Sequence, residues 1–276
     1  MTEIDTGRAR RAAEAAAREA GELIRRFIGR PQQTLAKSSP HDLVTEVDRS
    51  CQDAIFRALL QAFPGSAALG EENVAPGSAA AAQAVQDADK RLLWVVDPID
   101  GTLNFIRGIP VCSVSIGLVA DGRPVAGVVF DPLREEMFAG AAGQGAELNG
   151  RPILVSDEGD LGSAVLASGF PTGAYRGRNA EQIRRFGQHV RNVRALGSAA
   201  LHLAYVAAGR IDGFWENDLN AWDVCAGAVL VQAAGGRATD ADGSPYTLAT
   251  RHIAATNGRI HDALLRDLDV DRPPLP

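Results

Sequence analysis

The sequence is poor in residues that cross-link small folds or bind zinc. Only three of its 276 residues are cysteines, and Cys51, Cys112 and Cys225 form no CxxC or Cys/His ligand pattern. A disulfide framework needs paired cysteines, and a zinc site needs closely spaced ligands. We therefore expect reduced thiols, with neither a disulfide nor a zinc centre.

Long basic runs and long apolar runs are also missing. The 28 Lys and Arg residues against 34 Asp and Glu residues give a net charge of −6. Nucleic-acid binding depends on clustered positive charge, so no direct nucleic-acid partner is expected. Charges occur throughout the N-terminal segment, and no segment has the ~18 uninterrupted apolar residues of a membrane span. These absences predict a cytoplasmic protein without a membrane partner.

The residues that are present fit a globular protein, because 46% of the chain is apolar and 22% is charged. Helical spacing predicts a first long helix that begins near Thr2 and Asp5, a pair resembling a capping box, and ends near Phe27. Apolar runs on both sides of an Asp-Gly turn predict a hairpin near 112–130. Further helices are expected near 49–63, 76–90, 179–190, 198–208 and 222–234, and further strands near 92–97, 163–168, 211–216 and 252–256.

The pattern of elements changes in the middle of the chain. The first half contains antiparallel stretches and the second half alternates strands with helices, which favours a layered α/β or α+β protein over a doubly wound sheet. Asn, Gly, Pro and charged residues cluster at 149–160. We expect an α+β lobe at 1–150 and an α/β lobe at 151–276.

The most informative segment is WVVDPIDGTLNF at 94–105. Asp97 ends an apolar strand, Pro98 turns the chain, and Asp100 follows three residues later, so two carboxylates converge. Gly101 and Thr102 then begin a short helix, whose free backbone N–H groups favour an anion such as phosphate. Carboxylates beside an anion site suit Mg²⁺, which takes oxygen ligands. The alternative is a turn whose aspartates only cap local backbone.

Other acidic groups are spread along the chain. Glu71 and Glu72 end a short apolar run, Asp48 ends a polar stretch, and Asp223 stands in the first turn of an apolar helix. Each has an ordinary explanation, because Glu pairs are usually solvated and an Asp at a helix start is usually an N-cap. The five histidines are scattered and fit no phosphohistidine pattern, so a covalent histidine mechanism is not expected.

The order of these groups resembles the inositol monophosphatase family. These lithium-sensitive, Mg²⁺-dependent sugar phosphatases are related to fructose bisphosphatases and nucleotide bisphosphate phosphatases. The resemblance covers nearly the whole chain and implies the layered α-β-α-β-α sandwich of this α+β fold. The matching segments are LAKSSPHDLVTEVD (35–48), LGEEN (69–73), WVVDPIDGTLNF (94–105), LGSAAL (196–201) and FWENDLNAWDVCAGAVLVQAAGG (214–236).

The resemblance implies two to three Mg²⁺ ions in each active site. Glu71, Asp97 and the carbonyl of Ile99 would hold the first ion. Asp97, Asp100 and Asp223 would hold the second, and a third, weaker ion would lie near Glu71. The first lobe would therefore carry most of the metal ligands, and the second lobe would add Asp223.

The resemblance also implies roles in catalysis and binding. Asp48 and Thr102 would activate the attacking water, with Glu71 as a helper. The amides of Gly101 and Thr102 would hold the phosphate. The implied substrate contacts are Asp100, Ser198, Ala199, Glu216 and Asp223, with Lys37 at the edge of the site.

The predicted activity is Mg²⁺-dependent hydrolysis of a phosphate monoester, with myo-inositol monophosphate as the first substrate among polyol and sugar phosphates. The alternatives are a histidinol-phosphate phosphatase, a fructose 1,6-bisphosphatase or a nucleotide bisphosphate phosphatase of the same fold. A regulatory interaction protein that retains the fold, with a partner such as the transcription machinery, is the non-enzyme alternative. Family members are usually homodimers. The expected contact combines the hairpin at 114–130 with arginines 184, 185, 191 and 194.

Overall fold

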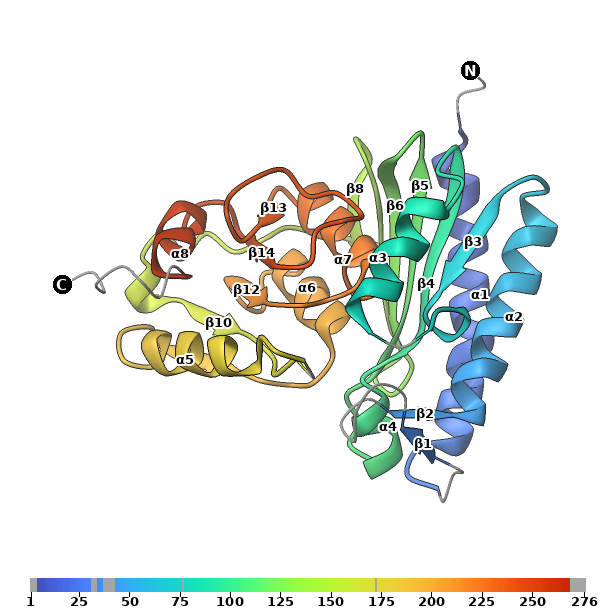
Figure 1. The fold of residues 1–276 in the computed structure, drawn as a ribbon. Coiled ribbons are helices and arrows are strands. Elements are labelled where there is room, and N and C mark those ends of the chain that lie inside the picture. Colours follow the sequence, from blue (N-terminus) through green and yellow to red (C-terminus); the bar gives the residue numbers. More distant parts are fainter. Residues whose placement is uncertain (1–3, 31–33, 37–42, 76, 172, 269–276) are drawn as a thin grey trace.

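The computed structural model describes residues 4–30, 34–36, 43–75, 77–171 and 173–268. In this part of the chain, helices and sheets alternate as five layers in the order α-β-α-β-α (Figure 1). The layered sandwich expected from the sequence is confirmed. None of the described helices is long and apolar enough to cross a lipid bilayer.

A seven-stranded sheet forms the second layer and carries the candidate site at one end. Its strands are hydrogen-bonded in the order β3-β4-β5-β6-β7-β8-β9. Only β3 and β4 are parallel, and the other neighbours are antiparallel. The strands are β3 (Ala67–Gly70), β4 (Leu92–Asp100), β5 (Ser113–Ala120), β6 (Arg123–Asp131), β7 (Glu136–Ala141), β8 (Gly145–Leu148) and β9 (Arg151–Ile153).

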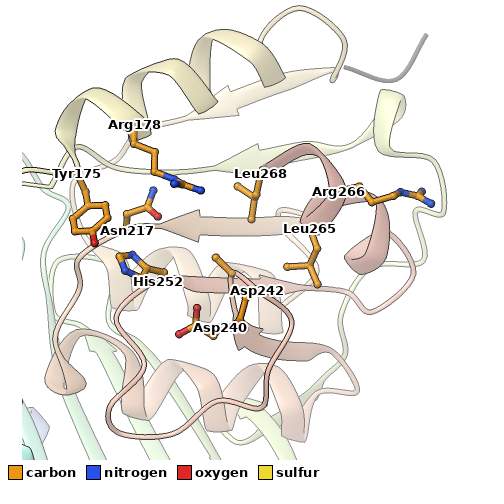
Figure 2. Close-up of a pocket in the computed structure, with 10 residues that line it drawn as sticks. Tyr175, Arg178, Asn217, Asp240, Asp242, His252, Leu265, Arg266 and Leu268 are labelled. Carbon is orange, nitrogen blue, oxygen red and sulfur yellow. The ribbon is translucent and has the colours of Figure 1, made fainter. Parts of the chain in front are cut away.

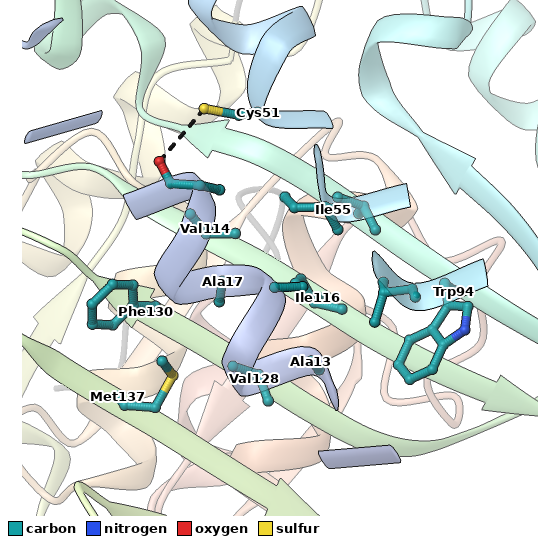
Figure 3. Packing of buried hydrophobic residues seen from close by; sticks show 14 of the residues in the cluster. Ala13, Ala17, Cys51, Ile55, Trp94, Val114, Ile116, Val128, Phe130 and Met137 are labelled. Atoms are coloured by element: carbon teal, nitrogen blue, oxygen red, sulfur yellow. Dashed lines mark hydrogen bonds between the residues drawn. The ribbon is translucent and has the colours of Figure 1, made fainter. Parts of the chain in front are cut away.

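Two helices, α1 (Thr6–Phe27) and α2 (Glu46–Ala62), cover the outer face of this sheet. A row of alanines on α1 faces the apolar side chains of β5 and β6 (Figure 3). Small side chains allow a close approach, because a Cβ on Gly21 would lie 2.5 Å from a ring atom of Phe130. The buried alanines of α1 are Ala9, Ala13, Ala16, Ala17 and Ala20.

The third layer consists of α6 (Ala199–Ala207) and α7 (Ala221–Ala233), which lie between the two sheets. Both helices are buried along nearly their whole length. A helix between two sheets contacts protein on every side and must be apolar all round. This explains why α6 and α7 consist largely of Ala, Val and Leu. α7 crosses β6 so closely that a Cβ on Gly127 would lie 2.3 Å from the carbonyl oxygen of Ala226.

A five-stranded mixed sheet forms the fourth layer, in the order β11-β10-β12-β14-β13. Its strands are β10 (Val165–Ala167), β11 (Asn192–Arg194), β12 (Gly213–Glu216), β13 (Arg237–Asp240) and β14 (Ile253–Thr256). The fifth layer consists of α5 (Arg176–Phe186) and α8 (His261–Leu268) (Figure 1). The remaining elements are β1 (Thr34–Ala36), β2 (Leu43–Thr45), η1 (Glu71–Asn73), α3 (Ser78–Asp87), α4 (Thr102–Arg107) and η2 (Leu161–Ser163).

The helices and strands expected from the sequence are present, with bounds shifted by a few residues. The first helix is capped by Asp5, whose carboxylate accepts a hydrogen bond from the Arg8 amide at 2.8 Å. Thr2 lies outside the described residues. The first sheet extends to Ile153 and the second begins at Val165. The division into lobes 1–150 and 151–276 stays a prediction.

The structure changes two expectations about the surface. Val114 and Phe130 are 0% and 1% exposed, because the hairpin lies inside the sheet and is covered by α1 and α7. Its apolar strands therefore offer little surface, and only the turn at 121–123 is exposed, so the dimer contact stays a prediction. Arg185 is 5% exposed, because helical spacing places it on the buried face of α5, whereas Arg184 is exposed. The three cysteines, Cys51, Cys112 and Cys225, are buried and free.

Candidate active site

The candidate site lies where β4 ends. Asp97 and Asp100 both belong to this strand, and the pairing register with β5 shifts between them. The Ile99 amide donates a hydrogen bond to Asp97 Oδ1 at 3.0 Å. Gly101 follows at φ 97°, where a Cβ would lie 3.0 Å from two backbone carbonyl oxygens. Glycine is required there, and α4 begins at the next residue, Thr102.

Asp48 reaches this point from the start of α2. Thr45 caps the helix, with its hydroxyl accepting from the Val47 amide at 3.2 Å and its own amide donating to Asp48 Oδ2 at 2.9 Å. The Thr102 hydroxyl lies 3.3 Å from Asp48 Oδ1 and 3.1 Å from the Ile99 carbonyl oxygen. Asp48 is 1% exposed. The fold thus brings together the residues expected to activate water.

Asp100 connects β4 to the middle layer of helices. Its carboxylate accepts hydrogen bonds from the Ser198 hydroxyl, from the Ala199 amide at 3.2 Å and from the Ala200 amide at 2.8 Å. A carboxylate at these amides complements the positive end of α6. Ser198 and Ala199 therefore hold Asp100, and their expected contact with substrate stays a prediction.

Asp223 reaches the site from the first turn of α7. It forms a capping box with Asn220, whose amide donates to Asp223 Oδ2 at 2.7 Å. The Asp97 carboxyl group is near enough to Asp223 to lower the pKa of that group, against the larger effect of burial. Glu71, which follows β3, lines the same cavity as Asp223, and the volume of this cavity is about 230 Å³. We call it the acidic cavity.

Glu216 closes another side of the acidic cavity at the end of β12. Its carboxylate is 9% exposed and makes no hydrogen bond or ion pair with the described residues. Gly169 leaves room for it, because a Cβ at that position would lie 2.2 Å from a carboxylate oxygen of Glu216. Phe170 and Pro171 follow on the cavity wall. Glu216 is thus an acceptor that faces the cavity.

Burial and mutual repulsion shift the pKa values of these carboxyl groups upwards. Burial, and then Asp223 and Asp100, raise the pKa of Glu216 to about 8. Burial is the main cause that raises the pKa of Asp100 and of Asp223, and the Glu71 carboxylate raises both further. Such crowding of negative charge favours the binding of protons or cations.

The donor set fits Mg²⁺ in chemical type, because it offers carboxylate and carbonyl oxygens without nitrogen or sulfur. Among the described residues, no three acidic, histidine or cysteine side chains are gathered as a ready ligand set. Asp100 is turned to the amides of Ala199 and Ala200 at the start of α6. The carboxylates thus share one region without a preformed coordination shell.

Sequence reasoning and structure differ at the edges of the site. Lys37 lies outside the described residues. Arg251 was not expected, yet its guanidinium donates to the Asp218 carboxylate at 2.7 Å and to Asn220 Oδ1 at 2.9 Å. It thereby fixes the loop between Glu216 and Asp223. The Asn220-x-x-Asp223 spacing is a capping-box signal that could have identified one end of this contact.

Comparison with known proteins gives a consistent result. The model of the family described as "Inositol monophosphatase family" matches residues 6–270. A curated protein named "Nus factor SuhB" from Pseudomonas aeruginosa is 42% identical over 268 residues, covering 94% of this chain and 95% of that protein. "Inositol monophosphatase 3" from Solanum lycopersicum is 41% identical, covering 92% of this chain and 94% of that protein.

A solved structure supports the same relationship. The extragenic suppressor protein suhB from Bartonella henselae superposes with a TM-score of 0.85 at 37% sequence identity. The alignment covers 95% of this chain and 98% of that chain. The similarity therefore extends over all five layers, including the elements that carry the acidic cavity.

Proposed function

The chain belongs to the inositol monophosphatase family, and from this premise we propose that it hydrolyses phosphate monoesters with Mg²⁺ as cofactor. The observation that carries the proposal is the gathering of Glu71, Asp97, Asp100 and Asp223 around the end of β4. Repulsion among these buried carboxylates is relieved when cations bind. We propose two to three Mg²⁺ ions in each site, held by Glu71, Asp97, the Ile99 carbonyl, Asp100 and Asp223.

Phosphate monoesters resist hydrolysis because the nucleophile must approach a negatively charged group. When bound, Mg²⁺ would neutralise the phosphoryl oxygens, lower the pKa of the attacking water and stabilise the leaving oxygen. The residues at the start of α4 orient the reactants. The amides of Gly101 and Thr102 would bind the phosphate at the positive end of the helix.

We assign proton transfer to Asp48 of α2 and Thr102 of α4, which contact each other. The Thr102 hydroxyl, 3.3 Å from Asp48 Oδ1, would orient the water, and Asp48 would accept the proton through it. Asp48 is suited to this role because the Thr45 amide fixes its other oxygen at 2.9 Å. Glu71, on the wall of the acidic cavity, would assist.

The alcohol part of the substrate would contact the opposite wall. Glu216 is an unpartnered acceptor at the cavity, which supports hydrogen bonds from substrate hydroxyl groups. We therefore propose myo-inositol monophosphate as the first substrate. Histidinol phosphate, fructose 1,6-bisphosphate and nucleotide bisphosphates are the competing substrates. The free thiols of the three cysteines support a cytoplasmic location.

The test is a panel of these esters and an aryl phosphate, assayed for phosphate release with Mg²⁺ and with excess EDTA. We expect the highest kcat/KM for inositol monophosphate and loss of turnover in EDTA that Mg²⁺ restores. A higher kcat/KM for histidinol phosphate than for inositol monophosphate would make histidinol phosphate the preferred substrate. Turnover that persists in EDTA would contradict the proposed mechanism.

A second candidate function is regulation through a protein partner. The observation in its favour is the 42% identity to a protein named "Nus factor SuhB". Both functions can reside in one fold when the partner binds residues outside the acidic cavity. The Asp97→Asn variant separates them. A regulatory function would survive this substitution, whereas the phosphatase function would not.

A further inference from the structure

Two segments from different strands form the side of the acidic cavity that would receive the alcohol part of the substrate. Phe170 and Pro171 follow β10, and Glu216 is the last residue of β12. The pairing of β10 with β12 ends at Ala167 and Phe214, before either segment reaches the cavity. The distance between the two segments therefore depends on side-chain contacts.

Asn179 of α5 connects the two segments. It is 0% exposed, and its side-chain nitrogen donates to the Ser168 hydroxyl at 2.9 Å and to the Gly169 carbonyl oxygen. Its side-chain oxygen accepts from the Asn217 backbone amide at 3.1 Å and from the Asn217 side chain. An asparagine side chain has two donor hydrogens and an oxygen that accepts two bonds, so its hydrogen-bonding capacity is filled. One buried side chain thus joins the end of β10 to the end of β12.

Helix α5 has further contacts with both segments. Gln182, one turn after Asn179, accepts from the Asn217 side chain at 2.8 Å and donates to a carbonyl oxygen at the end of α8 at 2.9 Å. Figure 2 shows Asn217 at the end of β12, beside the first turns of α5. The guanidinium of Arg176, at the start of α5, lies over the Phe170 ring, 5.5 Å from its centroid. The outermost layer of helices therefore supports this side of the cavity.

We propose that Asn179 is a positioning residue that sets the spacing between Phe170 and Glu216, and so determines which alcohol part fits the acidic cavity. The inference rests on the proposed phosphatase function. Phe170 offers an apolar ring that is 46% exposed, and Glu216 offers a hydrogen-bond acceptor. A cyclic polyol matches this pair, because its C–H groups can pack on the ring while its hydroxyl groups donate to the carboxylate.

The position of Asn179 leaves it no direct part in substrate binding. It is fully buried and does not line the acidic cavity, so it acts through the two segments that it joins. The tolerance of their spacing is narrow, because a Cβ on Gly169 would lie 2.2 Å from a carboxylate oxygen of Glu216. A misplacement of about 1 Å is enough to disturb binding in a preformed site.

The test compares Asn179→Asp with a matched variant, Asn257→Asp. Asn257 is 4% exposed, and its side-chain nitrogen likewise donates to a serine hydroxyl at 3.0 Å and to a backbone carbonyl oxygen at 2.7 Å. None of the described partners of its side chain lines the acidic cavity. Both substitutions remove two donors and keep the acceptor oxygen, so they differ in which segments lose their support.

The first measurement is kcat/KM for inositol monophosphate and for an aryl phosphate at saturating Mg²⁺. Asn179→Asp should lower the ratio of the two values at least about tenfold, mainly through KM, with the Mg²⁺ concentration for half-maximal activity unchanged. Asn257→Asp should keep the wild-type ratio. Asn217→Ala removes one of the two bonds from β12 to Asn179 and should lower the ratio about threefold.

The ratio in Asn217→Ala decides the question if Asn179→Asp does not fold, because Asn217 does not line the acidic cavity. A wild-type ratio in folded Asn179→Asp, or in Asn217→Ala when Asn179→Asp does not fold, would overturn the proposal. An equal fall of the ratio in Asn257→Asp would do the same, because the effect would then be one of general stability.

Crystal structures of the wild type and Asn179→Asp separate this inference from the proposed function. We expect Gly169 and Phe170 to be displaced from Glu216 by about 1 Å or more, with Asp97 and Asp223 in place. If the wild type hydrolysed none of the esters, the proposed function would be wrong, and this displacement would still decide the role of Asn179. Gly169 and Phe170 in their wild-type positions would refute that role.

Discussion

The carboxyl groups near the end of β4 and the acidic cavity differ in their hydrogen-bond partners, although they interact electrostatically with one another. Asp100 is held by three donors from α6, whereas Glu216 has none among the described residues. A carboxylate that is fixed by protein donors is suited to a constant position, and one without donors is available to a ligand. The difference separates proposed metal ligands from the proposed substrate contact.

Asp97→Asn removes one negative charge from the centre of the ligand set. We expect kcat to fall by at least about a hundredfold, because the proposed role shares this carboxylate between two cations. The amide keeps an acceptor for the Ile99 amide, so the fold should persist. Asp53→Asn, at an exposed position of α2, is the control. Normal Mg²⁺-dependent turnover by Asp97→Asn would contradict the assignment.

Glu216→Gln tests the substrate contact. Gln keeps one acceptor oxygen but replaces the other carboxyl oxygen by an NH2 donor, so a substrate hydroxyl that donates to that oxygen loses its acceptor, which costs about 1 to 3 kcal/mol in a desolvated site. We expect this loss in kcat/KM for inositol monophosphate and a much smaller one for an aryl phosphate that lacks the hydroxyl groups. Equal losses for both esters, measured with saturating Mg²⁺, would indicate a role in the metal site or the fold instead.

Helices in this protein position the site through their first turns. The starts of α2, α6 and α7 all meet near the end of β4, and each has a carboxylate at its amide groups. The loop before α7 is held from outside by Arg251, which donates to Asp218 and Asn220. Because these contacts fix the first turn of α7, they hold the Asp223 side chain in one direction.

Arg251→Gln should loosen the start of α7. Asp218 is 15% exposed and loses its ion pair, so we expect a loss of about 1 to 3 kcal/mol in the free energy of unfolding. The Mg²⁺ concentration for half-maximal activity should rise because Asp223 is less well positioned. Arg237→Gln breaks an exposed pair with Asp262 and serves as the control. If the two variants had equal free energies of unfolding in urea, the contacts of Arg251 would not stabilise the loop.

The packing of the layers buries ionisable groups that do not line the acidic cavity. His202 of α6 is 0% exposed, and the Leu196 amide donates to its Nε2 at 3.1 Å. Burial lowers the pKa of His202 to about 3, so the folded protein keeps this ring neutral. Its unfolded pKa is about 6.5. The layered packing therefore depends on pH.

Between about pH 6.5 and 3, the unfolded state binds a proton at His202 that the folded state does not. The free energy of unfolding should therefore fall on acidification, by up to about 1 kcal/mol per pH unit from this group. Urea unfolding at pH 7, 6 and 5 measures it. His202→Gln should reduce the pH dependence, and identical pH dependence in both proteins would exclude His202 as a source.

The final prediction concerns assembly. The family relationship implies a homodimer, and Leu103 and Ile109 are exposed apolar side chains, at 55% and 46%. Sedimentation equilibrium at micromolar concentration should give twice the 29.0 kDa chain mass. A single species of monomer mass would refute the dimer.

Local patterns in the sequence determined much of the first sheet and of the helices. Asp97 and Asp100 lie close along β4 because only Pro98 and Ile99 separate them, which no distant contact needs to enforce. The alanine row on α1 similarly predicts a helix. The strands β7 and β8 were not anticipated, because Gly and Ala interrupt their alternation of polar and apolar residues, and β9 was not anticipated because it has only three residues and contains Pro152.

Tertiary structure alone decided which distant groups meet. Ser198 reaches Asp100 across 98 positions, and Glu216 joins the acidic cavity from a different sheet. No local spacing encodes these meetings, because they follow from the stacking of five layers that bury both faces of α6 and α7.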